Sequence, residues 1–301
     1  MSILMFSMPG QEQLAQNLLQ RTGWLAGNMI LRHFPDGETY IRVLDDVKGR
    51  EVVILCQLHQ PDSNVLPLLL LADTLHDLGA TKVGLIAPYL AYMRQDKRFN
   101  EGEGVSSHYF AKLISRHLDW LVTVDPHLHR IHRLDEVYSI PATSLTAVKP
   151  IAEWIRQHID RPLVIGPDSE SEQWAARVAE AVGCPWEVLQ KERFGDRDVR
   201  ISLPHVENYP DRTPVLVDDI ISTGKTMMLA AQHLRAAGMA APVCVAVHGI
   251  FAAGALQEMQ AQGLTVVTCN SIPDDSNQID LAELLATGTI PRIEGQSPSP
   301  E

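Results

Sequence analysis

Short apolar runs alternate with longer amphipathic stretches along this chain, and this alternation restricts the fold more than any other feature. "EVVILCQL" (51–58) and "KVGLIAPYL" (82–90) have the composition of buried strands. Between them, "NVLPLLLLADTLHDLGA" (64–80) has the length of a helix and ends near Gly79. Strand, helix and strand at this spacing predict parallel α/β units, because a helix is the usual connection between parallel strands.

The same order returns in the second half of the chain. "TPVLVDDI" (213–220) has the pattern of a strand, and "TMMLAAQHLRAAGM" (226–239) has that of a helix ending at Gly238. "PVCVAVHGIF" (242–251) is the next strand. The repeat favours an internal duplication, although any α/β protein shows this order and the pattern alone leaves both explanations open. We expect an α/β fold with two similar domains, each a mainly parallel sheet flanked by helices.

The chain length of 301 residues also favours two domains. The proline-containing stretch "TAVKPIAEW" (146–154) marks the boundary, so the expected domains are residues 1–147 and 148–294. The tail 295–301, "GQSPSPE", is polar and rich in proline and serine. That composition is typical of disorder.

Composition restricts the class of partner. Hydrophobic residues make up 45% and charged residues 21% of the chain, as in ordinary globular proteins. The formal net charge is −12, whereas a broad nucleic-acid-binding face normally brings a basic excess. We therefore expect no nucleic-acid partner. Anionic small substrates stay compatible with this charge, because a site needs only a few local cations.

The sequence predicts a cytoplasmic protein without membrane contact. The stretch "MSILMFSMPGQEQ" lacks the features of a signal peptide, and the longest apolar run, Val65–Ala72, is too short to span a bilayer. The cysteines form no Cys-x-x-Cys pair, a pattern typical of reduced core cysteines in the cytosol. They are Cys56, Cys184, Cys244 and Cys269.

The string Gly-Lys-Thr within "VLVDDIISTGKT" (215–226) raises the question of a nucleotide-binding P-loop. That loop requires another glycine five residues before the glycine of this string. The position is occupied by Asp219, which puts a carboxylate where phosphates would lie. The sequence therefore argues against a P-loop here.

The same stretch is suited to a sugar phosphate. Its apolar run brings Asp218 and Asp219 to the carboxyl end of a predicted strand, where open α/β sheets bind ligands. The loop then enters a helix whose first N–H groups suit a phosphate, with hydroxyls from Thr223 and Thr226 and close approach at Gly224. The carboxylates can accept hydrogen bonds from sugar hydroxyls or contact Mg²⁺. An ordinary strand-to-helix turn is the alternative, but adjacent acids at a buried strand end are costly without a partner.

These residues resemble the phosphoribosyl-diphosphate loop of the type I phosphoribosyltransferase fold, with its pattern Asp-Asp-x-x-x-Thr-Gly-x-Thr. The resemblance covers a fold superfamily rather than one reaction. It implies that ribose 5-phosphate is bound by Asp218, Asp219, Ser222, Thr223, Gly224, Lys225 and Thr226. Lys225 fills a variable position at which diphosphokinase relatives more often have a small residue, so its role stays open.

Four further stretches resemble ribose-phosphate diphosphokinases, the enzymes that make 5-phosphoribosyl 1-diphosphate. They are "FPDGETYIRV" (34–43), "PYLAYMRQDKRFNEGEGVSSHYFAKLI" (88–114), "TVDPHLHRIH" (123–132) and "VIGPDSESEQWA" (164–175). With the phosphate loop, they extend the resemblance over nearly the whole chain. The second stretch is the most specific match, and simple phosphoribosyltransferases lack the first two.

By this resemblance, three of the stretches bind ATP. The implied residues are Phe34, Asp36, Glu38, Arg94, Gln95, Asp96 and His127. Phe34 can stack on a purine, while Asp36 and Glu38 can accept hydrogen bonds from its amino group or order their neighbours. In the family, the first stretch reaches the ATP site of an adjacent subunit. That implies a homo-oligomer, a dimer or a hexamer, with the active site near a subunit interface.

A local basic cluster supports a site for a triphosphate. Arg94, Lys97 and Arg98 gather positive charge in an otherwise acidic protein. A solvated surface is the simpler explanation of such a cluster taken alone. Its place directly after the apolar "APYLAY" favours the binding site.

Three histidines, His127, His129 and His132, raise the question of zinc. The pattern Asp-x-His-x-His lacks the thiols or second ligand cluster of a structural zinc site. The resemblance instead implies that His127 and Asp168 lie close to Mg²⁺, the expected cofactor, where a histidine can act through water. His129 either faces the nucleotide or packs internally.

The segment "QKERFGDRDVRI" (190–201) is charged and turn-like, as mobile loops often are. In the family, a Lys and an Arg two residues apart in this loop close over the reacting phosphates. Lys191 and Arg193 match that spacing, so the resemblance implies that they are catalytic. An exposed hairpin with unrelated charges is the alternative.

The resemblance implies transfer of the diphosphate of ATP to the anomeric hydroxyl of ribose 5-phosphate. A phosphoribosyltransferase that consumes the product is one alternative, and it would leave the stretches 34–43 and 88–98 without a role. A non-catalytic regulatory homologue is the other. No general base is evident: metal and desolvation can suffice, or Asp218 can assist.

Overall fold

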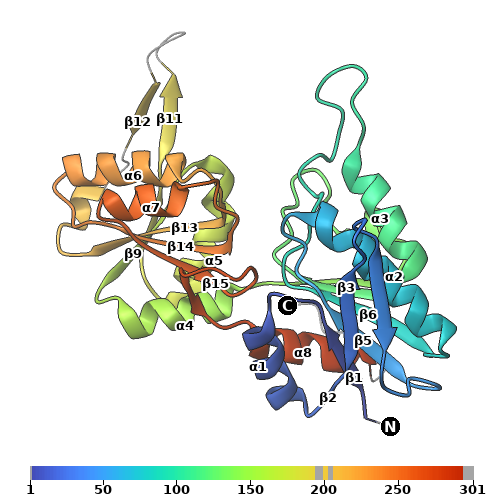
Figure 1. Ribbon diagram of the computed structural model, residues 1–301. Helices are drawn as coiled ribbons and strands as arrows, with labels where there is room; N and C mark the ends of the chain where they lie inside the picture. Colours follow the sequence, from blue (N-terminus) through green and yellow to red (C-terminus); the bar gives the residue numbers. More distant parts are fainter. Residues whose placement is uncertain (1, 194–198, 203–205, 294–301) are drawn as a thin grey trace. The chain divides into compact units, whose positions relative to one another are not determined.

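The computed structural model describes residues 2–193, 199–202 and 206–293, which form two compact units (Figure 1). Unit 1 comprises Met1–Leu145 and Leu281–Glu301, and unit 2 comprises Thr146–Asp280. The side chains of Glu170 and of residues 190–193 and 199–202 lie outside this description. The tail 295–301 also lies outside the described residues, so its disorder stays a prediction.

A six-stranded parallel sheet forms the centre of unit 1, in the order β2-β1-β5-β6-β7-β8. The strands are β1 (Leu4–Ser7), β2 (Leu25–Ala26), β5 (Glu51–Leu55), β6 (Lys82–Ala87), β7 (Trp120–Val124) and β8 (Ala142–Leu145). The central strands β5, β6 and β7 are buried along almost their whole length. Strands covered on both faces show continuous apolar runs rather than alternation, which explains the pattern seen in the sequence.

Helices cover both faces of this sheet (Figure 1). α2 (Pro61–Asp77) and α3 (Ser106–His117) pack together on one face, and α1 (Glu12–Thr22) packs with α8 (Ala282–Ile293) on the other. A short 3₁₀ turn, η1 (Leu134–Glu136), precedes β8. α2 begins before the predicted start at residue 64, at a proline, which is favoured in the first turn because its missing N–H needs no partner there.

The chain leaves unit 1 at Leu145 and returns to it at Leu281. α8 therefore groups with unit 1, whereas the division made from the sequence put residues 281–294 in the second domain. A close approach explains the docking of α8: a Cβ atom on Gly288 would lie 2.4 Å from a methyl carbon of Leu145. The missing side chain lets the helix lie directly against the end of β8.

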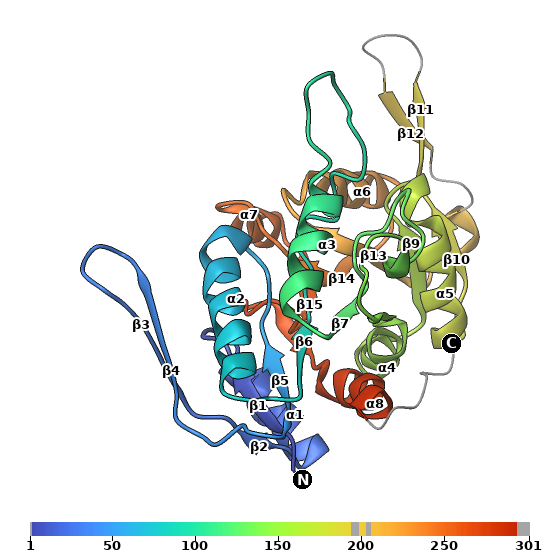
Figure 2. The same ribbon diagram turned by 90° about the vertical axis from the view of Figure 1, so that its right-hand side faces the viewer.

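A two-stranded antiparallel hairpin, β3 (Met29–His33) and β4 (Thr39–Val43), extends from the sheet of unit 1 (Figure 2). Its two faces differ. Met29, Leu31, Ile41 and Val43 pack against the hydrophobic core of unit 1. The alternate residues of both strands form the opposite face.

Unit 2 contains a second six-stranded parallel sheet, in the order β10-β9-β13-β14-β15-β16. The strands are β9 (Pro162–Gly166), β10 (Trp186–Val188), β13 (Thr213–Ile221), β14 (Val243–Gly249), β15 (Thr265–Cys269) and β16 (Asn277–Ile279). A separate antiparallel pair, β11 (Gln190–Arg193) and β12 (Val199–Ser202), projects from this unit (Figure 1).

The helices of unit 2 again cover both faces of the sheet, with α6 and α7 on one face and α4 and α5 on the other (Figure 1). They are α4 (Val148–His158), α5 (Glu172–Val182), α6 (Lys225–Ala236) and α7 (Ala255–Ala261), with 3₁₀ turns η2 (Ser169–Ser171) and η3 (Val206–Asn208). The strand order matches that of unit 1 position by position, so that β5 corresponds to β13 and β1 to β9. This confirms the predicted pair of similar α/β domains.

Two further expectations concern the cysteines and the membrane. Cys56, Cys244 and Cys269 are buried as free thiols, and Cys184 is half-buried. No helix within residues 2–193, 199–202 and 206–293 is long and apolar enough to cross a membrane.

Candidate functional site

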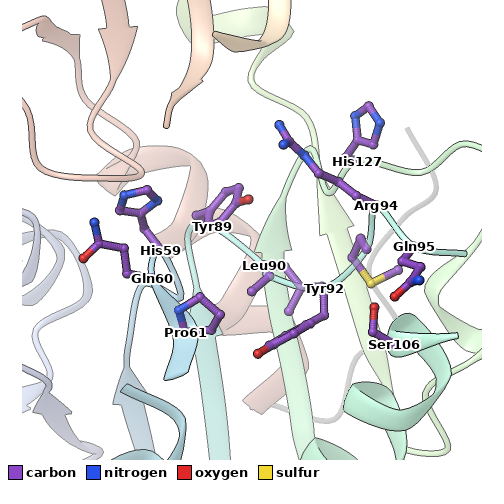
Figure 3. A pocket seen from close by; sticks show the side chains of 12 residues that line it. His59, Gln60, Pro61, Tyr89, Leu90, Tyr92, Arg94, Gln95, Ser106 and His127 are labelled. Atoms are coloured by element: carbon purple, nitrogen blue, oxygen red, sulfur yellow. The ribbon is translucent and has the colours of Figure 1, made fainter. Parts of the chain in front are cut away.

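Three loops at the carboxyl edge of the unit 1 sheet enclose a pocket of about 340 Å³ (Figure 3). They follow β5, β6 and β7, and this edge is where parallel sheets bind ligands. The lining residues are His59, Gln60, Pro61, Tyr89, Leu90, Ala91, Tyr92, Met93, Arg94, Gln95, Ser106 and His127. Arg94, Gln95 and His127, predicted to bind ATP, thus meet in one place. In Figure 3, Arg94 and His127 lie at one end of the pocket, and His59 and Tyr89 lie at the other.

The loop after β6 presents Arg94 from a rigid backbone. Met93 is buried in the core of unit 1, while Arg94 itself is exposed. Tyr92 adopts a left-handed conformation, with φ of 61°, which is uncommon for a residue other than glycine. Its hydroxyl donates a hydrogen bond to the carboxylate of Asp62, and its ring lies 4.8 Å from that of Phe110. These contacts hold the strained turn and direct Arg94 toward the pocket.

Asp96 joins the loop after β6 to the loop after β7. Its carboxylate is 1% exposed and accepts hydrogen bonds from the backbone N–H of Arg130, at 3.0 Å, and from the Arg130 guanidinium, at 3.1 Å. Burial would raise the pKa of Asp96, but these bonds outweigh it and lower the pKa. The structure therefore gives Asp96 a positioning contact within unit 1, and a contact of Asp96 with ATP stays a prediction.

The remaining charged residues of this region are arranged differently. Arg98 donates from Nε to the carbonyl oxygen of Glu103, 2.9 Å away, and so orders its own loop. Lys97 lies over the exposed ring of Phe99, with 5.3 Å between its Nζ and the ring centroid.

Of the three histidines considered for zinc, His127 is the one that lines the pocket. The described residues contain no cluster of three or more His, Cys, Asp or Glu side chains that could hold a metal ion.

His59 and Tyr89 were not predicted as site residues. Burial lowers the pKa of His59. The two rings pack at 65°, with centroids 6.3 Å apart, and form one wall of the pocket. The place of His59 in the chain could have indicated a site residue. It follows β5, and the corresponding strand β13 carries the aspartate pair near its end.

The tip of the β3–β4 hairpin carries Phe34, Asp36 and Glu38. Its sequence Phe-Pro-Asp-Gly suits a tight turn, and Gly37 takes the left-handed conformation that such a turn needs, with φ of 92°. The N–H of Phe34 donates to the carbonyl oxygen of Glu38, and Asp36 accepts from the N–H of Glu38. Phe34 is 40% exposed, and these three residues do not line the pocket of their own unit.

In unit 2, neighbouring strands bring three carboxylates together. Asp218 and Asp219 lie near the end of β13, and Asp168 follows β9, which pairs with β13. Burial, followed by the charges of Asp219 and Asp168, raises the pKa of Asp218 to about 8. The N–H of Asp219 donates to the Asp218 carboxyl over 3.0 Å. A divalent cation or donating sugar hydroxyls would relieve this crowding.

The predicted phosphate loop connects β13 to α6. Gly224 is the N-cap of α6 with φ of 68°, and a Cβ there would lie 2.5 Å from the sulfur of Met259. The carbonyl oxygen of Ser222 accepts from the N–H of Ala252, and Lys225 donates its N–H toward Thr223 Oγ1. The loop thus leads from the strand that carries the aspartates to the first N–H groups of the helix, including that of Thr226. This arrangement suits an anion next to a polyol.

Neither unit tests two of the predictions, the metal site and the catalytic pair. His127 belongs to unit 1 and Asp168 to unit 2, so a cation near both stays a prediction. The backbones of Lys191 and Arg193 lie in β11, opposite Ile201 and Val199 of β12, and their side chains lie outside the described part of the chain.

Comparison with known proteins assigns both halves of the chain. Residues 3–117 match the N-terminal domain of ribose phosphate pyrophosphokinase, and residues 134–286 match the phosphoribosyl transferase domain. A ribose-phosphate pyrophosphokinase of Methanobrevibacter smithii is 35% identical over 85% of this chain and 89% of its own length. One from Pyrococcus abyssi is 34% identical over 86% and 90%.

A solved structure shares the fold. The crystal structure of phosphoribosylpyrophosphate synthetase from Mycobacterium smegmatis covers 98% of this chain, and the match extends over 100% of that chain. The TM-score is 0.86, with 23% sequence identity. At that identity the likeness supports the fold, and the family assignment rests on the sequence matches.

Asp96→Asn tests the contact between the loops that follow β6 and β7 in unit 1. We expect a loss of about 1–2 kcal/mol in the free energy of unfolding at pH 7, because the amide replaces a buried, charge-assisted acceptor. Since folding lowers the pKa of Asp96, its contribution is fully present above the unfolded value of about 4 and is lost as the pH falls through the folded value. Denaturant unfolding at pH 7 and pH 3 measures both.

The matched control is Asp77→Asn, which changes an exposed carboxylate at the end of α2. It is expected to leave stability nearly unchanged at both pH values. A difference between wild type and Asp96→Asn that stays constant from pH 7 to pH 3 would contradict the assignment.

Proposed function

The chain belongs to the ribose-phosphate pyrophosphokinase family, and on this premise we propose that it transfers the diphosphate of ATP to the anomeric hydroxyl of ribose 5-phosphate. The anomeric oxygen forms a bond to the β-phosphorus, and the bond from that phosphorus to the oxygen of the α-phosphate breaks. The hydroxyl proton is released, and the products are 5-phosphoribosyl 1-diphosphate and AMP. The observation that carries the proposal is the sequence match over 85% of the chain, together with two different sites on two equivalent sheets.

Unit 2 supports the binding of ribose 5-phosphate. The hydroxyls of the sugar are donors, and Asp218 and Asp219 are acceptors whose mutual repulsion such donors reduce. The 5-phosphate is an anion, and the backbone N–H groups of residues 222–226 at the start of α6 are suited to it. In this assignment Ser222, Thr223 and Thr226 add hydroxyls, and Lys225 adds a positive charge.

Unit 1 supports the binding of ATP. Arg94 supplies a charge for the triphosphate, and Gln95 and His127 supply polar groups in the same pocket. Phe34 is the proposed stacking partner of the purine, with Asp36 and Glu38 beside it at the hairpin tip. Because these three do not line the pocket of their own unit, we infer that they act on the ATP of a second subunit in a homo-oligomer.

Enzymes of this family generally need a divalent metal, and we propose Mg²⁺. Asp218, Asp219 and Asp168 offer the carboxylate oxygens that Mg²⁺ prefers, but no three of the described side chains form a complete metal cluster, so phosphate and water oxygens would complete the coordination. By the resemblance, Asp168 and His127 would each contact Mg²⁺, which would neutralise and polarise the phosphate groups. The chain's own contribution is to orient the sugar and the nucleotide.

Lys191 and Arg193 are the proposed catalytic residues. The backbones of both residues lie in β11 of the β11–β12 hairpin, with Glu192 between them. Positive charge applied to the transferred group stabilises the transition state more than the substrates, and such an interaction raises kcat. The match of residues 3–117 to the N-terminal pyrophosphokinase domain disfavours a simple phosphoribosyltransferase. A cytoplasmic location stays a prediction.

Formation of AMP is the decisive assay. With ATP, ribose 5-phosphate and Mg²⁺, the wild type is expected to form equal amounts of AMP and 5-phosphoribosyl 1-diphosphate. Lys191→Ala combined with Arg193→Ala is expected to lower kcat by about 1000-fold or more, as loss of transition-state charge stabilisation does. The control is Arg200→Ala, which removes a like charge from β12. A wild type that forms no AMP would rule out the proposed activity.

Mixing two inactive variants tests whether the site is shared. Phe34→Ala and His127→Ala should each lose most activity alone. If Phe34 serves a neighbouring subunit, co-assembled mixtures contain sites with both side chains intact, and activity rises above that of either variant. Mixtures no more active than the average of the two would place both residues in a site within one subunit.

A further inference from the structure

A cluster of one cation and two aromatic rings lies on the β3–β4 hairpin of unit 1. The guanidinium carbon of Arg32 lies over two rings, 4.7 Å from the centroid of Phe34 and 4.2 Å from that of Tyr40. The two rings are nearly perpendicular, at 86°, with centroids 5.7 Å apart. Both cation distances are within the range of a favourable cation–π contact.

The geometry of the hairpin brings these side chains together. Arg32 and Tyr40 are directly paired across the two strands, and Phe34 follows two residues after Arg32 on the same face. The opposite face, with Leu31 and Ile41, packs on the core of unit 1. The cluster is therefore held on the outward face by a register that a one-residue slip would destroy.

The turn beside the cluster fixes the backbone of Phe34. Its N–H donates to the carbonyl oxygen of Glu38 over 2.8 Å, and its own carbonyl oxygen accepts from the N–H of Gly37 over 2.9 Å. With the backbone held by the turn and the ring covered on one side by Arg32, the side chain is ordered before any ligand binds. Phe34 stays 40% exposed as a residue and so keeps surface for a planar partner.

Arg32 has no charged partner that competes for it. Among the residues the structure describes, no carboxylate lies within ion-pair distance of its guanidinium. A guanidinium is planar and more weakly hydrated than an ammonium, and it stacks on aromatic faces. Its contacts in the cluster are thus with the two rings, and they act on the orientation of Phe34.

We propose that Arg32 and Tyr40 are positioning residues that fix the plane of the Phe34 ring for stacking on the purine of the diphosphate donor. The inference rests on the proposed function, in which ATP is the donor and Phe34 stacks on its purine. Holding the ring in its bound orientation reduces the ordering cost of binding, so the two residues act on affinity for the base. They do not touch the reacting phosphates, and kcat is unaffected by them.

A direct electrostatic role of Arg32 makes a different prediction. A guanidinium that attracts the triphosphate would strengthen binding of any polyphosphate, with or without a base. A positioning residue strengthens binding of the base alone. Adenosine, which lacks phosphates, and tripolyphosphate, which lacks the base, separate the two roles.

The test compares Arg32→Ala and Tyr40→Ala with two matched controls. Tyr40→Phe keeps the ring and removes the hydroxyl. Arg42→Ala removes an equal charge from the same face, at the neighbouring cross-strand pair with Ile30, outside the cluster. Calorimetric binding of adenosine and of tripolyphosphate to each protein is measured alongside KM for ATP, KM for ribose 5-phosphate and kcat. Thermal unfolding checks that the hairpin variants stay folded.

We expect Arg32→Ala and Tyr40→Ala to weaken adenosine binding and to raise KM for ATP by about fivefold, the size of lost exposed cation–π contacts. Tripolyphosphate binding, kcat and KM for ribose 5-phosphate stay unchanged, and both controls behave as wild type. Equal effects of Arg32→Ala and Arg42→Ala, or an equal loss of tripolyphosphate and adenosine binding, would overturn the proposal. Because adenosine binding needs no turnover, a wild type that forms no AMP refutes the activity and leaves this test valid.

Discussion

The half-buried carboxyl of Asp218 is the constraint around which the site in unit 2 is arranged. Burial and the charges of Asp219 and Asp168 raise its pKa to about 8, so the group is costly to ionise without a ligand. The arrangement follows from the pairing of β9 with β13, which puts the ends of two strands side by side. In the proposed reaction, sugar hydroxyls donate hydrogen bonds to the carboxylates, and a cation neutralises their charge. The fold thus keeps the carboxylates in an unfavourable contact that ligand binding makes favourable.

The two units show how one architecture supports two binding sites. Their strand orders match, and in both the loops at the carboxyl edge carry the polar residues. The two binding sites differ in the residues of individual loops. The strand β13 carries two acids near its end, before a glycine-containing turn, whereas the loop after β5 carries His59, whose pKa burial lowers. The first arrangement suits a sugar phosphate, and the second forms a wall of the pocket that Arg94 also lines. The proposed division of substrates follows from these loops and not from the sheets.

Local pattern predicted the parts of this structure that local interactions determine. The apolar runs of β5, β6 and β13 are set by neighbours in the chain, and each was visible in the sequence. Contacts between distant segments were not visible. The docking of α8 depends on the space beside Gly288, and the contact of Asp96 depends on Arg130, from a different loop. The pairing of Arg32 with Tyr40 needs the hairpin register. The roles of Lys191 and Arg193 came from resemblance, and their side chains lie outside the described residues.

The number of protons released on ligand binding tests the account of the acidic cluster most directly. Calorimetric titration at pH 7 with Mg²⁺ and ribose 5-phosphate, in two buffers of different ionisation enthalpy, counts these protons. Because the free carboxyl of Asp218 has a pKa of about 8 and binding favours its ionised form, wild type should release about one proton more than Asp218→Asn. Equal proton release by the two proteins would contradict the account, since Asp218 would then be ionised before any ligand arrives.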